Sequence, residues 1–137
     1  MNIERTIHIC GKDVLMRYCT ATETGYESIS GKSSVIFIPK VVKDNSGNII
    51  SVEPQTNVAD CITLAVAGII AAYSRLHQDA PITSDDILYD ATPDEVQNLI
   101  TVILEMRNEW YQVPNVVKPE DSITEQDVKQ DSEEEKN

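Results

Sequence analysis

The stretch VADCITLAVAGIIAAYSRLHQ, Val58 to Gln78, decides the predicted fold. Asn57 before it and Asp60 at its third position form a helix start of the capping-box type. The main apolar stripe has helical spacing and consists of Val58, Ile62, Ala65, Val66, Ile69, Tyr73 and Leu76. The reverse face has no charges and carries Leu64, Ala67, Gly68 and Ala71. Because a helix that is apolar nearly all round is buried on more than one side, we expect this helix to be central.

Two further helices are predicted after the central one. Thr83 or Ser84 begins a short helix that runs to Leu88. The stretch Thr92-Pro93-Asp94-Glu95 is a strong helix start, with a capping Thr, a Pro at the first helical position and acids in the first turn. Pro114 is expected to end this last helix, which buries Val96, Leu99, Ile100, Ile103, Leu104, Met106 and Trp110.

Upstream, the stretch HICGKDVLMRYC, His8 to Cys19, predicts a β-hairpin. Apolar residues alternate on both sides of a Gly-Lys pair, and Gly suits a turn position with positive φ. With Gly11 and Lys12 as the loop, Ile9 faces Val14. One face of this hairpin is then apolar and consists of Ile7, Ile9, Val14, Met16 and Tyr18.

The hairpin also decides how the cysteines are interpreted. Cys10 lies at the turn and Cys19 lies about 20 Å away along the opposite strand, whereas a disulfide needs Cα atoms within about 7 Å. A zinc site would need paired Cys or clustered His, and His8-x-Cys10 stands alone in the sequence. Cys61 belongs to the central helix. We therefore expect three ordinary thiols and no metal site.

Residues 20–54 have a less regular pattern. A short helix is predicted between a capping Thr20 and a terminating Gly31. The apolar run Val35 to Val42 contains Pro39, and with the later run Ile49 to Val52 it predicts a second hairpin or a flexible arm. An exposed apolar strand edge of this kind suits strand addition by another chain, or else it covers the core.

Together these elements predict an α+β fold, with one or two N-terminal hairpins packed on a small bundle of three to four helices. Residues 1–118 form a single domain, in which residues 34–54 are a hairpin or arm insertion. Residues 119–137 carry eight acids, two lysines and little apolar side chain, which predicts a disordered acidic tail. Its expected role is solubility, or mimicry of an acidic partner.

Composition excludes several classes of function. The net charge of −12 argues against a nucleic-acid partner. The odd cysteine count and the lack of an apolar N-terminal signal segment indicate a reducing cytoplasm. The longest uncharged run, Cys61 to Ser74, is shorter than the roughly 20 residues of a membrane helix, so no membrane partner is expected.

Sequence motifs for catalysis are absent. There is no Gly-rich phosphate loop, no Gly-x-Ser-x-Gly elbow and no helix with metal-spaced His and Glu. His8 and His77 are the two histidines, and the adjacent Asp85 and Asp86 do not share a helix face. We predict no catalytic residue and no cofactor.

The order of elements resembles that of the tail assembly chaperones of long-tailed bacteriophages and prophages. Members begin with an apolar-x-Gly-Lys hairpin followed by "LR" plus an aromatic, which Leu15-Met16-Arg17-Tyr18 echoes. An Ala-rich helix, an "I-T-x-x-x-I" helix start like Ile82 to Ile87, and the long helix PDEVQNLITVILEMRNEWY follow. The resemblance covers roughly Ile7 to Pro114, and Ser34 to Pro54 departs from it as an insertion.

The resemblance implies a non-enzymatic chaperone of virion morphogenesis in the host bacterial cytoplasm, absent from the mature virion. Such proteins bind the tape-measure protein and recruit tail-tube protein; whether this chain forms a homo-oligomer stays open. The alternative is a small cytoplasmic adaptor or regulatory module unrelated to phage. Because the hairpin and the last helix can cover the main stripe, the expected partner surface is Leu64, Ala67, Gly68, Ala71, Ile36, Ile38 and Val41.

Overall fold

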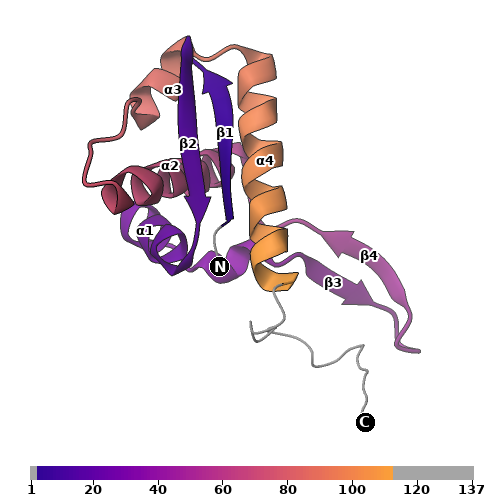
Figure 1. The fold of residues 1–137 in the computed structure, drawn as a ribbon. Helices are drawn as coiled ribbons and strands as arrows, with labels where there is room; N and C mark the ends of the chain where they lie inside the picture. The colour runs from indigo at the N-terminus through magenta and orange to yellow at the C-terminus, as the bar shows by residue number, and fades with distance from the viewer. Residues whose placement is uncertain (1–2, 113–137) are drawn as a thin grey trace. The chain divides into compact units, whose positions relative to one another are not determined.

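Residues 3–112 are described by a computed structural model, drawn as a ribbon in Figure 1. The elements are β1 (Ile3–Ile9), β2 (Lys12–Tyr18), α1 (Thr20–Ser30), the 3-10 helix η1 (Ser34–Phe37), β3 (Lys40–Lys43), β4 (Ile49–Glu53), α2 (Val58–Arg75), α3 (Ser84–Asp90) and α4 (Pro93–Gln112). The predicted α+β class is confirmed. The predicted helix end at Pro114, the boundary at 118 and the acidic tail lie outside the described residues.

The chain divides into two units, Met1–Met106 and Arg107–Asn137. Both sheets, α1 to α3 and most of α4 belong to the first unit. In the described part of the second unit, the guanidinium carbon of Arg107 lies 4.6 Å from the centre of the Tyr111 ring. This is a cation–π arrangement local to the end of α4.

The strands β1 and β2 form the predicted antiparallel hairpin, but its loop is one residue earlier than expected. Cys10 and Gly11 both have positive φ (54° and 74°), as a type I′ turn requires, and Ile9 pairs with Lys12. The expected loop of Gly11 and Lys12 is therefore wrong. Each residue's cross-strand partner differs from the predicted one by two positions. Because side chains alternate between the two faces of a strand, the same residues stay on the apolar face, and Ile3 joins them.

The buried face of this hairpin packs on α2, and α1 lies along α2 as well (Figure 1). Val14, Met16 and Tyr18 are at most 1% exposed, and full burial of such side chains contributes about 1.5–3 kcal/mol each. At Gly68 an added Cβ would lie 3.2 Å from the Arg17 carbonyl oxygen and 3.2 Å from Ile103 Cδ1. The helix α2 is therefore central in the fold, because its small residues let neighbouring elements approach closely on several sides.

Helix starts follow local capping chemistry. The predicted starts of α2 and α4 are confirmed, and α3 begins with the Thr83 cap and runs two residues past the predicted end at Leu88. In each case the cap side chain accepts from a backbone N–H while an acid accepts from the cap residue's N–H. The pairs are Asn57 with Asp60, Thr83 with Asp86, and Thr92 with Glu95.

The helix α1 begins at Thr20, so its N-cap lies one residue before the predicted cap at Thr20. Cys19 is the N-cap, and its N–H donates to Thr22 Oγ1 at 3.1 Å. The Thr22 hydroxyl donates in turn to the Arg17 carbonyl at 2.7 Å, which ties the start of α1 to the end of β2. Gly31 terminates the helix with φ of 72°, as predicted.

A buried carboxylate joins α1 to the start of α2. Asp60 is 6% exposed, and its side chain accepts hydrogen bonds from Lys32 Nζ at 2.9 Å and from the Tyr26 hydroxyl at 3.2 Å. Burial acts to raise the pKa of Asp60, but the hydrogen bonds from Lys32, the Asn57 backbone and Tyr26 outweigh it and hold that pKa below its ordinary value. The charged form of Asp60 therefore stabilises the contact between the two helices.

The predicted strand Val35 to Val42 is wrong in its first half. Ser33 Oγ accepts from the Val35 N–H at 3.2 Å, and η1 forms instead of a strand. Phe37 then packs edge-on against the Tyr26 ring with centroids 5.0 Å apart, which anchors this turn to α1. The second hairpin consists of β3 and β4, which are antiparallel with a register shift after Val42.

Candidate functional site

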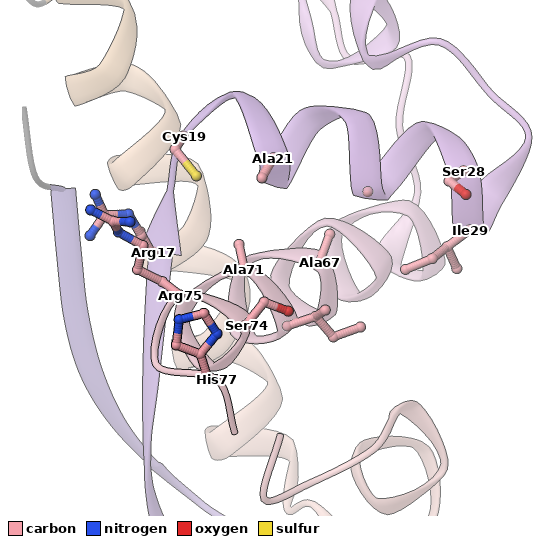
Figure 2. Close-up of a pocket in the computed structure, with 12 residues that line it drawn as sticks. Arg17, Cys19, Ala21, Ser28, Ile29, Ala67, Ala71, Ser74, Arg75 and His77 are labelled. Carbon is pink, nitrogen blue, oxygen red and sulfur yellow. The ribbon is translucent and has the colours of Figure 1, made fainter. Parts of the chain in front are cut away.

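A groove of about 580 Å³ lies between α1 and α2, and we call it the α1/α2 groove (Figure 2). Ala21, Gly25, Ser28 and Ile29 of α1 line one wall, and Ala67, Ile70, Ala71 and Ser74 of α2 line the other. These positions recur every three or four residues, so each set forms one stripe along its helix. The remaining lining residues are Arg17, Cys19, Arg75 and His77.

Small side chains create this groove. An ideal Cβ at Gly25 would lie 3.4 Å from the Cβ of Ala67, so the two helices touch at that point. Alanine and glycine along both stripes are too short to fill the space above this contact. Ile29 and Ile70 remain 54% and 44% exposed beside the space, which gives the groove an apolar surface that no described residue covers.

One end of the groove is cationic. Figure 2 shows Arg17, Arg75 and His77 at the end opposite Ile29. Arg17 Nη1 is 2.8 Å from Glu4 Oε2, and both side chains are partly buried. Arg75 is exposed on the last turn of α2, where a cation also interacts favourably with the helix dipole.

His77 reaches the groove through an unusual backbone conformation. Its φ is 58°, in the left-handed region, and its N–H donates to the Ser74 carbonyl at 3.0 Å. The next N–H, of Gln78, donates to the Tyr73 carbonyl at 2.9 Å and closes the end of α2. A left-handed conformation costs a non-glycine residue roughly 1–2 kcal/mol. Nothing in the sequence pattern around His77 indicated this position.

The predicted partner face of α2 divides into two parts. All four residues are buried, Leu64 fully and Gly68 against β2 and α4, so the expectation that this face stays uncovered is wrong for the whole face. The reason is that β2 and α4 cover α2 at Gly68, while α1, whose apolar stripe is weak, covers it at Ala67. Ala67 and Ala71 are 2% and 8% exposed and line the α1/α2 groove. A role of Ala67 and Ala71 in binding stays a prediction.

The predicted arm residues lie elsewhere in the first unit. Ile36 and Ile38 are half-buried around η1, and Val41 on β3 is 47% exposed. Val41 pairs with Val52, which is 58% exposed, so this hairpin keeps apolar side chains in solvent. These residues do not line the α1/α2 groove.

A second hollow, of about 490 Å³, is polar and surrounds the turn of the first hairpin. The Cys10 thiol lies 3.5 Å from the Asp86 carbonyl, and burial, together with the nearby acids Glu95, Asp86 and Asp90, raises its pKa. A thiol of raised pKa is a poor nucleophile at neutral pH. The Asp86 and Glu95 carboxylates accept the capping hydrogen bonds of α3 and α4, which gives both a structural role.

A third hollow, of about 390 Å³, is apolar and lies between the start of α2, α3 and α4. Val58 and Leu88 on its rim are 59% and 57% exposed. No charged side chain lines it, and Gln97 is the one polar amide among its lining residues. Within residues 3–112, no group of three or more His, Cys, Asp or Glu side chains is arranged to hold a metal ion.

The helix α2 has the length and the mean hydropathy, 1.4, that a membrane-spanning helix would need, and 61% of it is buried within the fold. The core helix of a globular domain has the same character, so this feature is weak support for a membrane span. Comparison of the chain with protein-family models, with curated proteins and with solved structures gives no match.

Proposed function

We propose that this chain is a non-enzymatic tail assembly chaperone of a long-tailed phage or prophage. It binds apolar helical segments of the tape-measure protein in the host cytoplasm and helps to recruit tail-tube subunits. The observation that carries the proposal is the α1/α2 groove, an apolar surface left open beside a complete core. The order of elements, which resembles that of such chaperones, supports the choice of partner.

The groove has the form of a helix-binding site. Two helices already form its walls, and their small residues let a third helix approach closely, as in helix-in-groove recognition. Ala67 and Arg75 are eight residues apart on α2, which corresponds to about 12 Å, or roughly two helical turns. A site this short covers only part of a long partner, so many copies of the chain are needed to coat one tape-measure protein.

The chemistry of the described residues supports a binding role. Burial raises the pKa of Cys61 as well as that of Cys10, which keeps both thiols protonated near neutral pH. The buried carboxylate, Asp60, is held by three hydrogen-bond donors between α1 and α2. These groups serve the fold, while the open groove presents mainly apolar side chains.

The test is co-expression with the tape-measure protein encoded beside this chain. The expected result is that the tape-measure protein moves from the insoluble to the soluble fraction and copurifies with the chain. Equal insolubility with and without the chain would contradict the proposal. A long downstream gene for an apolar helical protein is the matching genomic observation.

The alternative function, a small adaptor module, is favoured by the second hairpin. Val41, Ile50 and Val52 stay exposed there, and a two-stranded sheet leaves two edges open to strand addition. Changing Val41 and Val52 to Thr would keep the β propensity but remove the apolar contact. If that variant loses its cellular partners while groove variants keep them, the adaptor function is the correct one.

A further inference from the structure

We propose that the α1/α2 groove selects an amphipathic helix that carries a carboxylate on its apolar face, and that Arg75 binds this carboxylate. This inference rests on the proposed function, since it states the chemistry of the partner helix. It starts from a contrast in charge. The chain has a net charge of −12, yet the groove is lined by two arginines and a histidine and by no Asp or Glu.

The two carboxylates of α1 that lie next to the groove wall in sequence are engaged elsewhere. Glu23 of α1 accepts a hydrogen bond from the Tyr18 hydroxyl at 2.8 Å. Glu27 of α1 accepts one from the Ser34 N–H at 2.9 Å. Neither side chain lines the groove, so the positive charge at its end stays available to a partner.

The two arginines of the groove differ in whether an ion pair already offsets their charge. Arg17 already forms an ion pair with Glu4, which offsets its charge. Arg75 forms no ion pair with another residue of 3–112, and it is exposed on the last turn of α2. A guanidinium can bind a carboxylate through two parallel hydrogen bonds, which gives geometry as well as attraction.

The two ends of the groove differ, so the partner helix has one preferred direction. Ile29 provides an apolar end, and Arg75 lies at the opposite end (Figure 2). The eight-residue separation of Ala67 and Arg75 corresponds to about 12 Å along α2. A partner helix laid along the groove therefore presents apolar residues at helical spacing and then Asp or Glu about two turns further along the same face.

The test uses two fluorescein-labelled synthetic peptides of about five helical turns each. Both carry the same Leu/Ala stripe, and they differ only in having Glu or Lys two turns beyond the last Leu. Fluorescence anisotropy with the full chain measures both affinities. The expected result is that the Glu peptide binds roughly tenfold more tightly than the Lys peptide, and that Arg75→Glu reverses this order.

Two controls locate the effect. Lys43→Glu makes the same change of charge on β3, outside the groove, and is expected to leave the order of the peptides unchanged. Ala21→Trp fills the groove from an exposed position on α1 and is expected to abolish binding of both peptides, whereas Ala59→Trp on α2, outside the groove, is not. Circular dichroism checks that each variant is folded.

The inference is overturned by no binding of either peptide at millimolar concentration, by equal binding of both, or by an order that Arg75→Glu does not change. A dimer in sizing chromatography that Ala21→Trp converts to a monomer would also overturn it, because the occupant would be a second copy of the chain. If the tape-measure protein copurifies equally with the wild type and with Arg75→Glu, the inference fails while the proposed function stands. If it copurifies with neither but the Glu peptide still binds, the inference holds and the proposed function fails.

Discussion

Gly25 on α1 and Ala67 on α2 are in direct opposition: a Cβ added to Gly25 would lie 3.4 Å from the Cβ of Ala67, an ordinary van der Waals distance. Gly68, the next residue of α2, has no such room. Its added Cβ would lie 3.2 Å from the Arg17 carbonyl oxygen, which is backbone and cannot easily move. Gly25 therefore has room for a side chain and Gly68 does not, although both lie in helices.

The first prediction compares Gly25→Ala with Gly68→Ala. Alanine favours a helix over glycine by about 0.8–1 kcal/mol, so Gly25→Ala should raise the free energy of unfolding by up to that amount. Gly68→Ala crowds β2 and Ile103, which costs about 1–3 kcal/mol. The gain in helix propensity offsets part of this cost, so the free energy of unfolding should fall by the remainder. Urea unfolding of both variants measures the difference. A Gly25→Ala variant less stable than Gly68→Ala would contradict this packing.

A second prediction concerns a charge placed on each wall of the groove. Ala67 is 2% exposed, so Ala67→Glu buries an unpaired charge and should cost several kcal/mol and unfold the domain. Ala21 is exposed on the opposite wall, so Ala21→Glu should stay folded. Far-ultraviolet circular dichroism at 25 °C separates the two. A folded Ala67→Glu variant would show that α1 does not cover α2 there.

Acid sensitivity follows from Asp60. Its hydrogen bonds hold its pKa below the ordinary value of about 3.9, so the folded state binds a proton less readily than the unfolded state. The stability that the charged form of Asp60 contributes is fully present above the pKa of Asp60 in the unfolded state. It is lost as the pH falls through the lower pKa of Asp60 in the folded state. Replacing Asp60 with Asn should therefore reduce stability more at pH 7 than at pH 3. Urea midpoints at the two pH values check this, and an equal loss at both would contradict the ion pair with Lys32.

The cysteines give a fourth prediction. Cys10, Cys19 and Cys61 are free thiols, and burial with nearby acids raises the pKa of Cys10. Iodoacetamide should modify Cys10 more slowly at pH 7.5 than it modifies a small model thiol, with the rate rising at higher pH. Peptide mass spectrometry measures each site. Modification of Cys10 faster than the model thiol would mean that its thiolate is stabilised.

The helix starts were predictable because capping is local. Asn57 with Asp60 and Thr92 with Glu95 satisfy backbone groups within four residues, so no distant contact is needed. The hairpin loop was misplaced by one residue because alternation alone fits both positions. Only the left-handed conformation of Cys10 distinguishes them.

The groove itself could not be predicted from periodicity. It exists because Gly25 meets Ala67 across two helices that are far apart in sequence. The covering role of α1 was missed because its stripe is weak, while Tyr26 of α1 is fully buried and contacts Asp60 and Phe37 outside the helix. The cationic end had no sequence signal, since Arg17 and Arg75 converge only in the fold.

The most direct test of the central claim is the solubility of the co-expressed tape-measure protein with three forms of the chain: wild type, Ala21→Trp and Ala59→Trp. Both substitutions add the same side chain at an exposed helical alanine, but only Ala21 lines the α1/α2 groove. The groove account predicts that wild type and Ala59→Trp keep the tape-measure protein soluble and that Ala21→Trp, still folded, does not. Equal solubility with Ala21→Trp and Ala59→Trp would contradict it.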